Sequence, residues 1–319
     1  MQTFSGQEIC ENLDFDGLVP AISSGYLNPP TAPQRIHHQI NMPATQVEGS
    51  DATLLYMPAW RAGDLIGIKL VTIFPDNARR NEPSVYGNYL LLDGASGRPL
   101  AMLDGTALTL RRTAAVSALA SSRLARKDAR TLLMIGTGAL APHLIEAHAR
   151  FHDLARILIW GRRHEKAEAL AKSLSPKMPC PVEAIDDLKM AQGDADIISA
   201  ATLTTEPLIK CDLVRPGTHV GLVGAYRPDM AEADSALMAK GRIFVDTRAG
   251  ALAEAGEILQ AIQSGHISED DIIAELSDPD TKWQRGSTDE ITIFKSVGSA
   301  ISDFAAAGYL WQKQTPNHK

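Results

Sequence analysis

The residues best suited to chemistry lie in the stretch MIGTGALAPHLIEAHARF at 134–151, where two glycines follow an apolar run and precede a helical pattern. The letters GTGALA match the Gly-x-Gly-x-x-Ala variant of the dinucleotide-binding fingerprint. In such a loop the first glycine permits a tight turn, the second lets a pyrophosphate approach the backbone, and the helix N-terminus supplies N–H donors. A turn without a ligand is the alternative. We predict that a dinucleotide is bound by Gly136, Thr137, Gly138, Ala139 and Leu140.

The end of the next apolar run indicates which dinucleotide is bound. NAD sites usually carry Asp or Glu there, which binds the ribose 2′-hydroxyl. The segment WGRRH at 160–164 contains no acid and two adjacent arginines, Arg162 and Arg163. Guanidinium groups pair with phosphate through two hydrogen bonds, so we predict that these residues prefer NADP(H), with NAD(H) as the alternative cofactor. The alternative is that the two arginines belong to a solvent-exposed basic loop that binds no cofactor.

The elements around this loop alternate between strand and helix from about residue 130. ARTLLMIG, ARILIWG, ADIISAAT, THVGLVGA and RIFVDT read as short buried strands, and ALAPHLIEAHARF and HEKAEALAKSL as helices. Continuous apolar strands separated by helices are typical of a doubly wound parallel sheet, so we predict an α/β fold of the Rossmann type. ISEDDIIAEL reads as an acidic helix start.

Residues 1–115 show a different pattern. LLYMPAW, LIGIKLVTIFP, YLLLDGASGRPLAML and ALTLRR read as strands, with hairpin-like turns at RAGD and DGASGRP. An α+β domain therefore precedes the parallel sheet. The last stretch, SVGSAISDFAAAGYLW, has helical spacing and is expected to pack on that first domain.

The overall composition is that of an ordinary globular protein. The 319 residues are 45% hydrophobic and 22% charged, with a net charge of −7, so we expect no nucleic-acid partner. No segment approaches the roughly 20 apolar residues that span a bilayer, so we expect no membrane partner. A polar N-terminus and three scattered cysteines favour a cytoplasmic location.

Several segments in the same order resemble the ornithine cyclodeaminase/mu-crystallin family. They are GIKLVTIFPDN with Lys69, TLRRTAA with Arg112, the glycine-rich stretch and TIFKSVGSAISD. The resemblance implies a homodimer in which a Rossmann-type domain (116–294) is inserted into a substrate and dimerisation domain (1–115 and 295–319). Known activities of the family are ornithine cyclodeamination, reduction of cyclic ketimines and amino-acid dehydrogenation.

The resemblance also implies roles for individual residues. Arg35, Lys69 and Arg112 correspond to the cationic cluster around a substrate carboxylate, and Lys69 and Arg112 are the candidate catalytic residues. An unpaired ammonium would be costly in the apolar strand LIGIKLVTIF, which favours a site role for Lys69. Arg111 would point to the opposite face of an extended segment and receives no role. Further cofactor-binding positions are Thr113, Thr202, Val223, Gly224, Ser296 and Gly298. For the threonines of ATLTTEPL, an ordinary strand-end turn is the alternative.

One departure from the cyclodeaminase pattern selects the branch of the family. Cyclodeaminases carry an aspartate two residues after the glycine that ends this strand, whereas GAYRPD places Tyr226 there and Asp229 beyond a proline. The segment looks like the ketimine reductase side. We therefore predict NADPH-dependent reduction of Δ1-pyrroline-2-carboxylate to L-proline, or of Δ1-piperideine-2-carboxylate to L-pipecolate. The alternatives are an ornithine cyclodeaminase or alanine-type dehydrogenase, or a mu-crystallin-like binding protein with little turnover. His148 and His152 lack an HExxH pattern, and we expect no metal.

Overall fold

The computed structural model describes residues 1–41, 52–80 and 82–315, and the chain divides into two compact units. One unit comprises residues 1–112 and 300–319, and the other comprises residues 113–299. The predicted class, an α/β fold with a Rossmann-type parallel sheet and an accompanying α+β unit, is confirmed.

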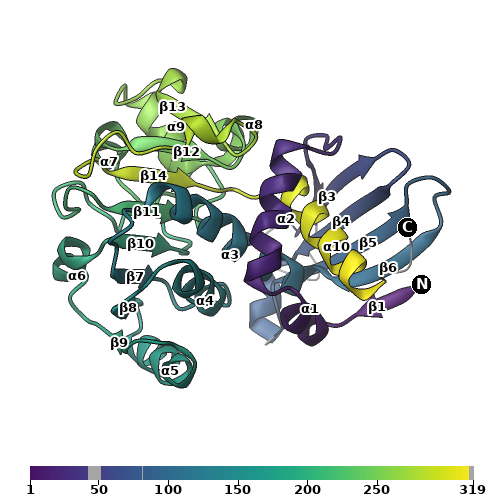
Figure 1. The fold of residues 1–319 in the computed structure, drawn as a ribbon, viewed down its shortest axis with the longest axis horizontal. Helices are drawn as coiled ribbons and strands as arrows, with labels where there is room; N and C mark the ends of the chain where they lie inside the picture. The colour runs from purple at the N-terminus through teal and green to yellow at the C-terminus, as the bar shows by residue number, and fades with distance from the viewer. Residues whose placement is uncertain (42–51, 81, 316–319) are drawn as a thin grey trace. The chain divides into compact units, whose positions relative to one another are not determined.

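The unit 113–299 is built on an eight-stranded sheet in the order β13-β12-β14-β11-β10-β7-β8-β9, in which neighbouring strands run parallel. Helices flank the sheet on both sides (Figure 1). Its strands are short and mostly buried because both faces are covered. The strands are β7 (Thr131–Ile135), β8 (Arg156–Trp160), β9 (Val182–Ala184), β10 (Ile197–Ala200), β11 (His219–Leu222), β12 (Arg242–Val245), β13 (Ile272–Glu275) and β14 (Thr292–Lys295). The helices are α4 (Ala141–Phe151), α5 (His164–Leu174), α6 (Leu188–Asp194), α7 (Ser235–Lys240), α8 (Arg248–Glu254) and α9 (Gly256–Gln263).

The strand order of this sheet reverses between β7 and β10. From β7 the chain proceeds outward to β8 and β9, and it then returns to β10 on the other side of β7 and continues to β11. In open α/β sheets ligands bind at such a switch point, in the crevice at the carboxyl ends of the strands. The switch point therefore locates a candidate site before any side chain is considered.

The unit of residues 1–112 and 300–319 contains a six-stranded sheet in the order β1-β6-β5-β4-β3-β2, antiparallel except for the pair β1–β6. Helices α2 and α10 lie side by side over one face of it (Figure 1). The strands are β1 (Gln2–Phe4), β2 (Ile36–Ile40), β3 (Ala52–Arg61), β4 (Leu65–Ile73), β5 (Val85–Asp93) and β6 (Pro99–Asp104), and the helices are α1 (Gly6–Asn12), α2 (Phe15–Leu27) and α10 (Ala300–Gln314). The turns predicted at RAGD and DGASGRP join β3 to β4 and β5 to β6.

The prediction of a strand at ALTLRR is wrong, because these residues belong to helix α3 (Gly105–Leu124). The Asp104 carboxylate accepts hydrogen bonds from the backbone N–H groups of Thr106 and Ala107, at 2.9 Å each. This N-terminal cap satisfies donors that the first helical turn leaves free, and it starts the helix. The alanine- and leucine-rich run that follows continues it to Leu124.

The prediction of a helix at ISEDDIIAEL is also wrong. Its acidic part forms a short 3-10 turn (Glu269–Asp271), and Ile272–Glu275 forms the edge strand β13. Two β-branched isoleucines in succession favour a strand, and pairing with β12 satisfies the backbone. Tertiary pairing therefore overrides the acidic helix-start signal at this position.

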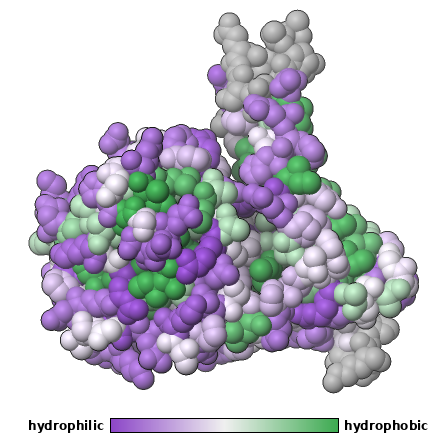
Figure 2. Space-filling model, turned by 90° about the horizontal axis from the view of Figure 1, so that it is seen from above, coloured by the Kyte–Doolittle hydropathy of each residue, from purple (hydrophilic) through white to green (hydrophobic). Residues whose placement is uncertain are grey.

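Within the described part of the chain, none of the helices combines the length and the hydropathy that crossing a bilayer requires. Figure 2 shows hydrophilic residues over much of one face of the molecule, with hydrophobic residues gathered in smaller patches among them.

Candidate active site

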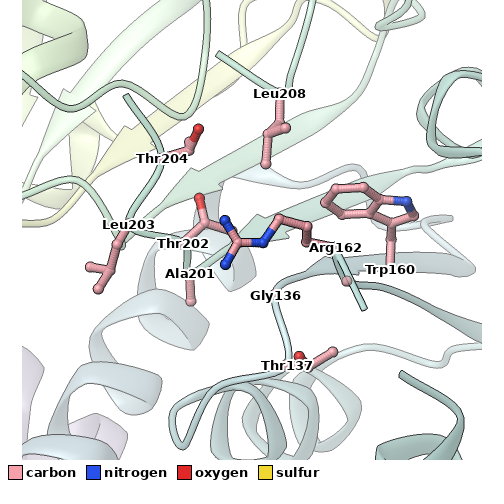
Figure 3. Close-up of a pocket in the computed structure, with 10 residues that line it drawn as sticks. Gly136, Thr137, Trp160, Arg162, Ala201, Thr202, Leu203, Thr204 and Leu208 are labelled. Carbon is pink, nitrogen blue, oxygen red and sulfur yellow. The ribbon is translucent and has the colours of Figure 1, made fainter. Parts of the chain in front are cut away.

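A cavity of about 440 Å³ lies at the switch point of the parallel sheet. It is formed by the segments that follow three strands, β7, β8 and β10, and Figure 3 shows the Arg162 side chain extending toward Thr202 in this view. The volume falls in the range of ligand pockets. The lining residues are Gly136, Thr137, Trp160, Gly161, Arg162, Ala201, Thr202, Leu203, Thr204 and Leu208.

The glycine-rich turn has the geometry that a pyrophosphate requires. Gly136 has φ +120°, and a Cβ there would lie 2.6 Å from the carbonyl oxygen of Ala201. Both observations demand glycine. At Gly138 a Cβ would meet no heavy atom of the described residues within 4 Å beyond its chain neighbours, so the backbone faces open space. The turn 138–140 leads into the N-terminus of α4, so the backbone at Gly138 and the positive end of this helix fit a dinucleotide phosphate.

Arg162 and Arg163 lie at the carboxyl end of β8. Both side chains are exposed, Arg162 lines the cavity, and Arg163 precedes the first residue of α5. Among the described residues neither guanidinium makes a hydrogen bond or an ion pair. The neighbouring His164 differs, because its Nδ1 lies 2.7 Å from Asp186 Oδ1. The two arginines thus leave positive charge available to an anion.

A buried carboxylate, Glu232, joins the ends of β10 and β11. Its Oε1 accepts hydrogen bonds from the backbone N–H and the hydroxyl of Thr202, at 2.6 and 2.9 Å. Its Oε2 accepts one from the backbone N–H of Gly224 at 2.7 Å. A Cβ on Gly224 would lie 2.0 Å from the carbonyl oxygen of Thr202, so glycine allows the two strand ends to approach each other.

Glu232 belongs to a fully buried network of charged groups. Glu257 accepts a hydrogen bond from the backbone N–H of Glu232 at 3.1 Å, and its carboxylate lies 3.1 Å from the Lys295 ammonium. Lys295 also donates to the carbonyl oxygen of Ala225. Burial raises the pKa of Glu232, while Lys295 opposes that shift and Glu257 adds to it. Since the hydrogen-bonding partners of Glu232 at the two strand ends are donors, the carboxylate form matches the site.

A second buried carboxylate, Asp246, organises the segment after β14. Asp246 Oδ2 accepts hydrogen bonds from the Ser296 hydroxyl at 2.8 Å, from Val297 N at 3.1 Å and from Gly298 N at 2.7 Å. Gly298 has φ +84°, a conformation that glycine adopts without strain. One side chain therefore accepts three hydrogen bonds from this turn.

In the other unit, Lys69 and Arg112 share one carboxylate. Asp303, on α10, lies with its Oδ1 3.0 Å from Lys69 Nζ and 2.9 Å from Arg112 Nε. The three side chains are at most 6% exposed. Asp303 Oδ2 and the hydroxyl of Tyr89, which stands opposite Lys69 in the β4–β5 pair, have no hydrogen-bond partner among the described residues.

The charges in this cluster shift one another's ionisation. Burial lowers the pKa of Lys69 to about 8; the charges of Arg112 and Arg35 lower it too, while Asp303 opposes the shift. Burial would raise the pKa of Asp303, but Arg112 and Lys69 hold it below its usual value. The influence of Arg35 on the pKa of Lys69 places its charge near this cluster. Lys69 and Arg112, with the charge of Arg35 nearby, thus face the single carboxylate of Asp303. The excess positive charge suits a carboxylate ligand.

Arg111 has no place in this cluster, although the reason we predicted was wrong. The segment is helical, so Arg111 and Arg112 point about 100° apart around the helix rather than to opposite faces of a strand. Arg111 is buried, donates to the carbonyl oxygen of Leu13 from Nε and Nη2 at 3.0 and 2.6 Å, and lies 3.8 Å from the ring centre of Phe15. It ties α3 to the start of α2.

The structure groups the predicted residues into separate sets. Gly136, Thr137, Arg162 and Thr202 line one cavity, and Lys69 and Arg112 share Asp303. The remaining predicted positions are Gly138, Ala139 and Leu140 in the turn after Gly136, Arg163 beside Arg162, Val223 and Gly224 after β11, Ser296 and Gly298 after β14, and Thr113, which is buried on α3 directly after Arg112.

Sequence reasoning missed the four carboxylates that hold these residues, Asp303, Glu232, Glu257 and Asp246. For Asp303 a signal existed. It occupies the apolar face of the last helix with Ala300, Phe304 and Ala307, and a charge at such a position requires a buried partner.

His148 on α4 is buried, and His152, which caps the C-terminal end of this helix, is half-buried. The Ser121 hydroxyl lies 3.1 Å from His148 Nδ1 and 2.9 Å from His152 Nε2. Burial lowers the pKa of His148 to about 3 and that of His152 to about 4. In the part of the chain that the structure describes, no group of three or more His, Cys, Asp or Glu side chains could hold a metal ion.

The fold and the crevice at its switch point define a Rossmann-type dinucleotide-binding protein. The chain belongs to the ornithine cyclodeaminase/mu-crystallin family, whose model matches residues 7–317. It is 36% identical over 317 residues to the Δ1-pyrroline-2-carboxylate reductase of Colwellia psychrerythraea, covering 98% of this chain and 99% of that protein.

Two solved structures are similar over almost the whole chain. The Δ1-pyrroline-2-carboxylate reductase of Thermococcus litoralis, in complex with NADH and L-proline, superimposes with a TM-score of 0.91 at 29% identity, covering 99% of this chain and 98% of that one. An archaeal alanine dehydrogenase dimer with bound NAD gives a TM-score of 0.88 at 26% identity, covering 100% and 97%.

Proposed function

We propose that the protein reduces a small cyclic ketimine carboxylate with a reduced nicotinamide cofactor. Δ1-Pyrroline-2-carboxylate, which yields L-proline, is the first substrate, and Δ1-piperideine-2-carboxylate, which yields L-pipecolate, is the second. The observation that carries the proposal is the buried pair Lys69–Arg112 on one carboxylate, in a chain whose full-length relatives include reductases of this name.

The cationic cluster provides an anchor for the substrate carboxylate. A guanidinium such as that of Arg112 binds a carboxylate with directional hydrogen bonds, and the charge of Arg35, which lowers the pKa of Lys69, adds to the positive potential here. Asp303 takes up part of the positive charge, so the cluster tolerates a protonated imine better than three unopposed cations would. The arrangement favours a ligand that carries an anion and a cation close together, as a cyclic imino acid does.

Lys69 is the proposed proton source. With a pKa of about 8 it is mostly protonated at neutral pH, yet it releases a proton far more readily than an exposed lysine. Protonation of the imine nitrogen makes the adjacent carbon more electrophilic. Lys69 and Arg112 are therefore the proposed catalytic residues, with Lys69 serving both carboxylate binding and proton delivery.

The nicotinamide cofactor supplies the hydride, and the unit 113–299 is proposed to hold it. The turn 136–140 would bind the pyrophosphate, and Arg162 and Arg163 would bind a ribose 2′-phosphate, which makes NADP(H) the preferred form and NAD(H) the alternative. Thr202, Val223, Gly224, Ser296 and Gly298 are proposed for the nicotinamide half, and Thr113 is proposed as a further cofactor-binding residue.

The loop after β11 argues against cyclodeamination. Tyr226 stands at the position where a cyclodeaminase of this family would carry its aspartate. Asp229 does not substitute for it, because both of its carboxylate oxygens accept hydrogen bonds from Arg227, at 2.9 and 2.7 Å, on the exposed surface. A reductase needs no group that activates water for ammonia release.

The outer face of the six-stranded sheet supports a homodimer. Residues of β4 alternate, so that Lys69 faces the helices while Leu70 faces outward and is 43% exposed. Tyr86 on β5 and Met102 on β6 are also exposed. Open apolar sheet faces are usually covered by another chain, and a second copy with the same face satisfies this requirement. Light scattering of the purified protein measures the oligomeric state directly.

Cofactor oxidation with both ketimines tests the proposed reaction. We expect rapid loss of the reduced-nicotinamide absorbance with NADPH, and a collapse of activity in Arg112→Gln. The control Arg98→Gln removes an exposed arginine and is expected to retain activity. Ammonia release from ornithine with oxidised cofactor would favour cyclodeamination instead. Cofactor binding without turnover of any ketimine, ornithine or alanine would favour a mu-crystallin-like binding protein.

A further inference from the structure

The buried carboxylate of Glu232 lies beneath the wall of the cavity rather than in it. It is 0% exposed, and it reaches the cavity through Thr202, whose backbone N–H and hydroxyl donate to it. Through Gly224 it also fixes the end of β11. One side chain therefore determines the relative position of two strand ends on the same side of the switch point.

These strand ends are the place where the nicotinamide half of a dinucleotide would bind, an inference that rests on the proposed function. In a doubly wound sheet the dinucleotide crosses the crevice. Arg162, on the β8 side, is suited to the adenosine ribose phosphate, so the other half lies on the side of β10 and β11. Thr202 and Gly224 belong to that side.

The charge buried behind these strand ends is predominantly negative. Glu232 and Glu257 are each at most 1% exposed, and among the described residues of this network Lys295, which pairs with Glu257, is the buried cation. Buried charges are screened much less than exposed ones, so this excess extends into the adjoining cavity.

We propose that Glu232 is a positioning residue that holds the nicotinamide-binding strand ends together and, by its charge, makes this half of the site bind the oxidised cofactor in preference to the reduced one. The oxidised nicotinamide ring carries a positive charge and the reduced ring carries none. A fixed negative charge therefore distinguishes the two redox states, whereas a purely structural side chain would affect both equally.

The test compares dissociation constants for NADP⁺ and NADPH, measured by calorimetry on the intact protein, in wild type and Glu232→Gln. The variant keeps the size of the side chain and removes its charge. We expect both dissociation constants to rise, and the constant for NADP⁺ to rise about tenfold more than that for NADPH. The same measurement with NAD⁺ and NADH is made if the protein prefers those forms.

The matched control is Asp234→Asn, which removes a carboxylate two residues away. Asp234 caps helix α7 through Leu237 N at 2.9 Å and accepts from Cys211 N, without contacting either strand end. This variant is expected to lose some stability and to keep the wild-type ratio of the two dissociation constants. If Glu232→Gln does not fold, Glu257→Gln removes a charge from the same network and is expected to shift the ratio in the same direction.

The outcomes separate this inference from the proposed function. A ratio that stays within about twofold of wild type in a folded Glu232→Gln or Glu257→Gln variant overturns the inference and leaves the proposed function intact. Failure of wild type to bind any nicotinamide cofactor overturns the proposed function and the inference with it. An equal change of ratio in Asp234→Asn also overturns the inference, because the effect would then not belong to the strand ends.

Discussion

Substitution of Asp303 by asparagine tests the cationic cluster most directly. Asparagine keeps an oxygen that can accept from Lys69 and Arg112, but it removes the charge that stabilises both cations. Removing one partner of a buried ion pair typically costs about 3–5 kcal/mol, and the retained hydrogen bonds favour the lower end of that range. The folded protein is therefore expected to lose roughly 3 kcal/mol of its free energy of unfolding.

The same substitution should change the pH dependence of catalysis. As the proposed acid, Lys69 would act in its protonated form, so kcat/KM is expected to be maximal below its pKa of about 8 and to fall as the pH rises through that value. Asp303 raises the pKa of Lys69, and an opposite charge at this distance is worth roughly 1–3 pH units. In Asp303→Asn the alkaline limb should move to lower pH by that amount.

The assay is the pH profile of kcat/KM for ketimine reduction, alongside urea unfolding. The matched control is Asp14→Asn, which removes a different ion pair to α10, the one with Lys313 at 2.6 Å, and leaves the cluster untouched. The control should keep the wild-type alkaline limb. An alkaline limb in a folded Asp303→Asn variant that coincides with that of wild type would refute the reasoning that Lys69 is the acid and Asp303 sets its ionisation.

Three further predictions concern the other unit. Arg162→Ala combined with Arg163→Ala should raise the KM for NADPH by about 10–100-fold and leave that for NADH within a few-fold; equal effects on both would contradict phosphate binding. Gly138→Ala should fold like wild type, since a Cβ there meets open space, but lose affinity for either dinucleotide in a calorimetric titration. His148 and His152 have folded pKa values of about 3 and 4, below the unfolded value of 6.5, so stability is complete above 6.5 and is lost as the pH falls toward those values. Between about pH 4 and 6.5 the two histidines should together lower the free energy of unfolding by roughly 2.7 kcal/mol for each pH unit that the pH falls. Urea unfolding of His148→Gln should show about half of this pH dependence.

The parallel sheet could be predicted from sequence because each of its strands is buried on both faces. Such strands read as uninterrupted apolar runs such as TLLMI and RILIW, and the glycine-rich turn between a strand and a helix has a local signature. The prediction of a strand at ALTLRR failed because this segment has no such local signature. Its residue types suit either a strand or a helix, and the deciding feature is the N-terminal cap from Asp104, which precedes the segment.

The buried carboxylates could not be predicted because their partners are distant in sequence. Asp303 meets Lys69 across 234 positions, and Glu257 meets Lys295 across 38. Local patterns can show that Lys69 requires a partner in an apolar strand, but only the packing of α10 on β4 identifies that partner. The sequence therefore indicated the candidate cations Lys69 and Arg112, but it did not indicate the carboxylate that binds them.

The two units carry opposite excesses of buried charge, and under the proposed function these excesses would favour one direction of the reaction. In one unit Lys69 and Arg112 outweigh Asp303, and in the other Glu232 and Glu257 outweigh Lys295. Hydride transfer to a protonated imine removes a positive charge from the substrate and leaves one on the nicotinamide ring. A cationic surrounding favours the first change and an anionic surrounding favours the second, because fixed charges in a poorly screened interior stabilise the charge that develops beside them. On the proposed placement of substrate and nicotinamide, both excesses favour reduction of the imine over oxidation of the amine, and Glu232→Gln should slow reduction more than oxidation.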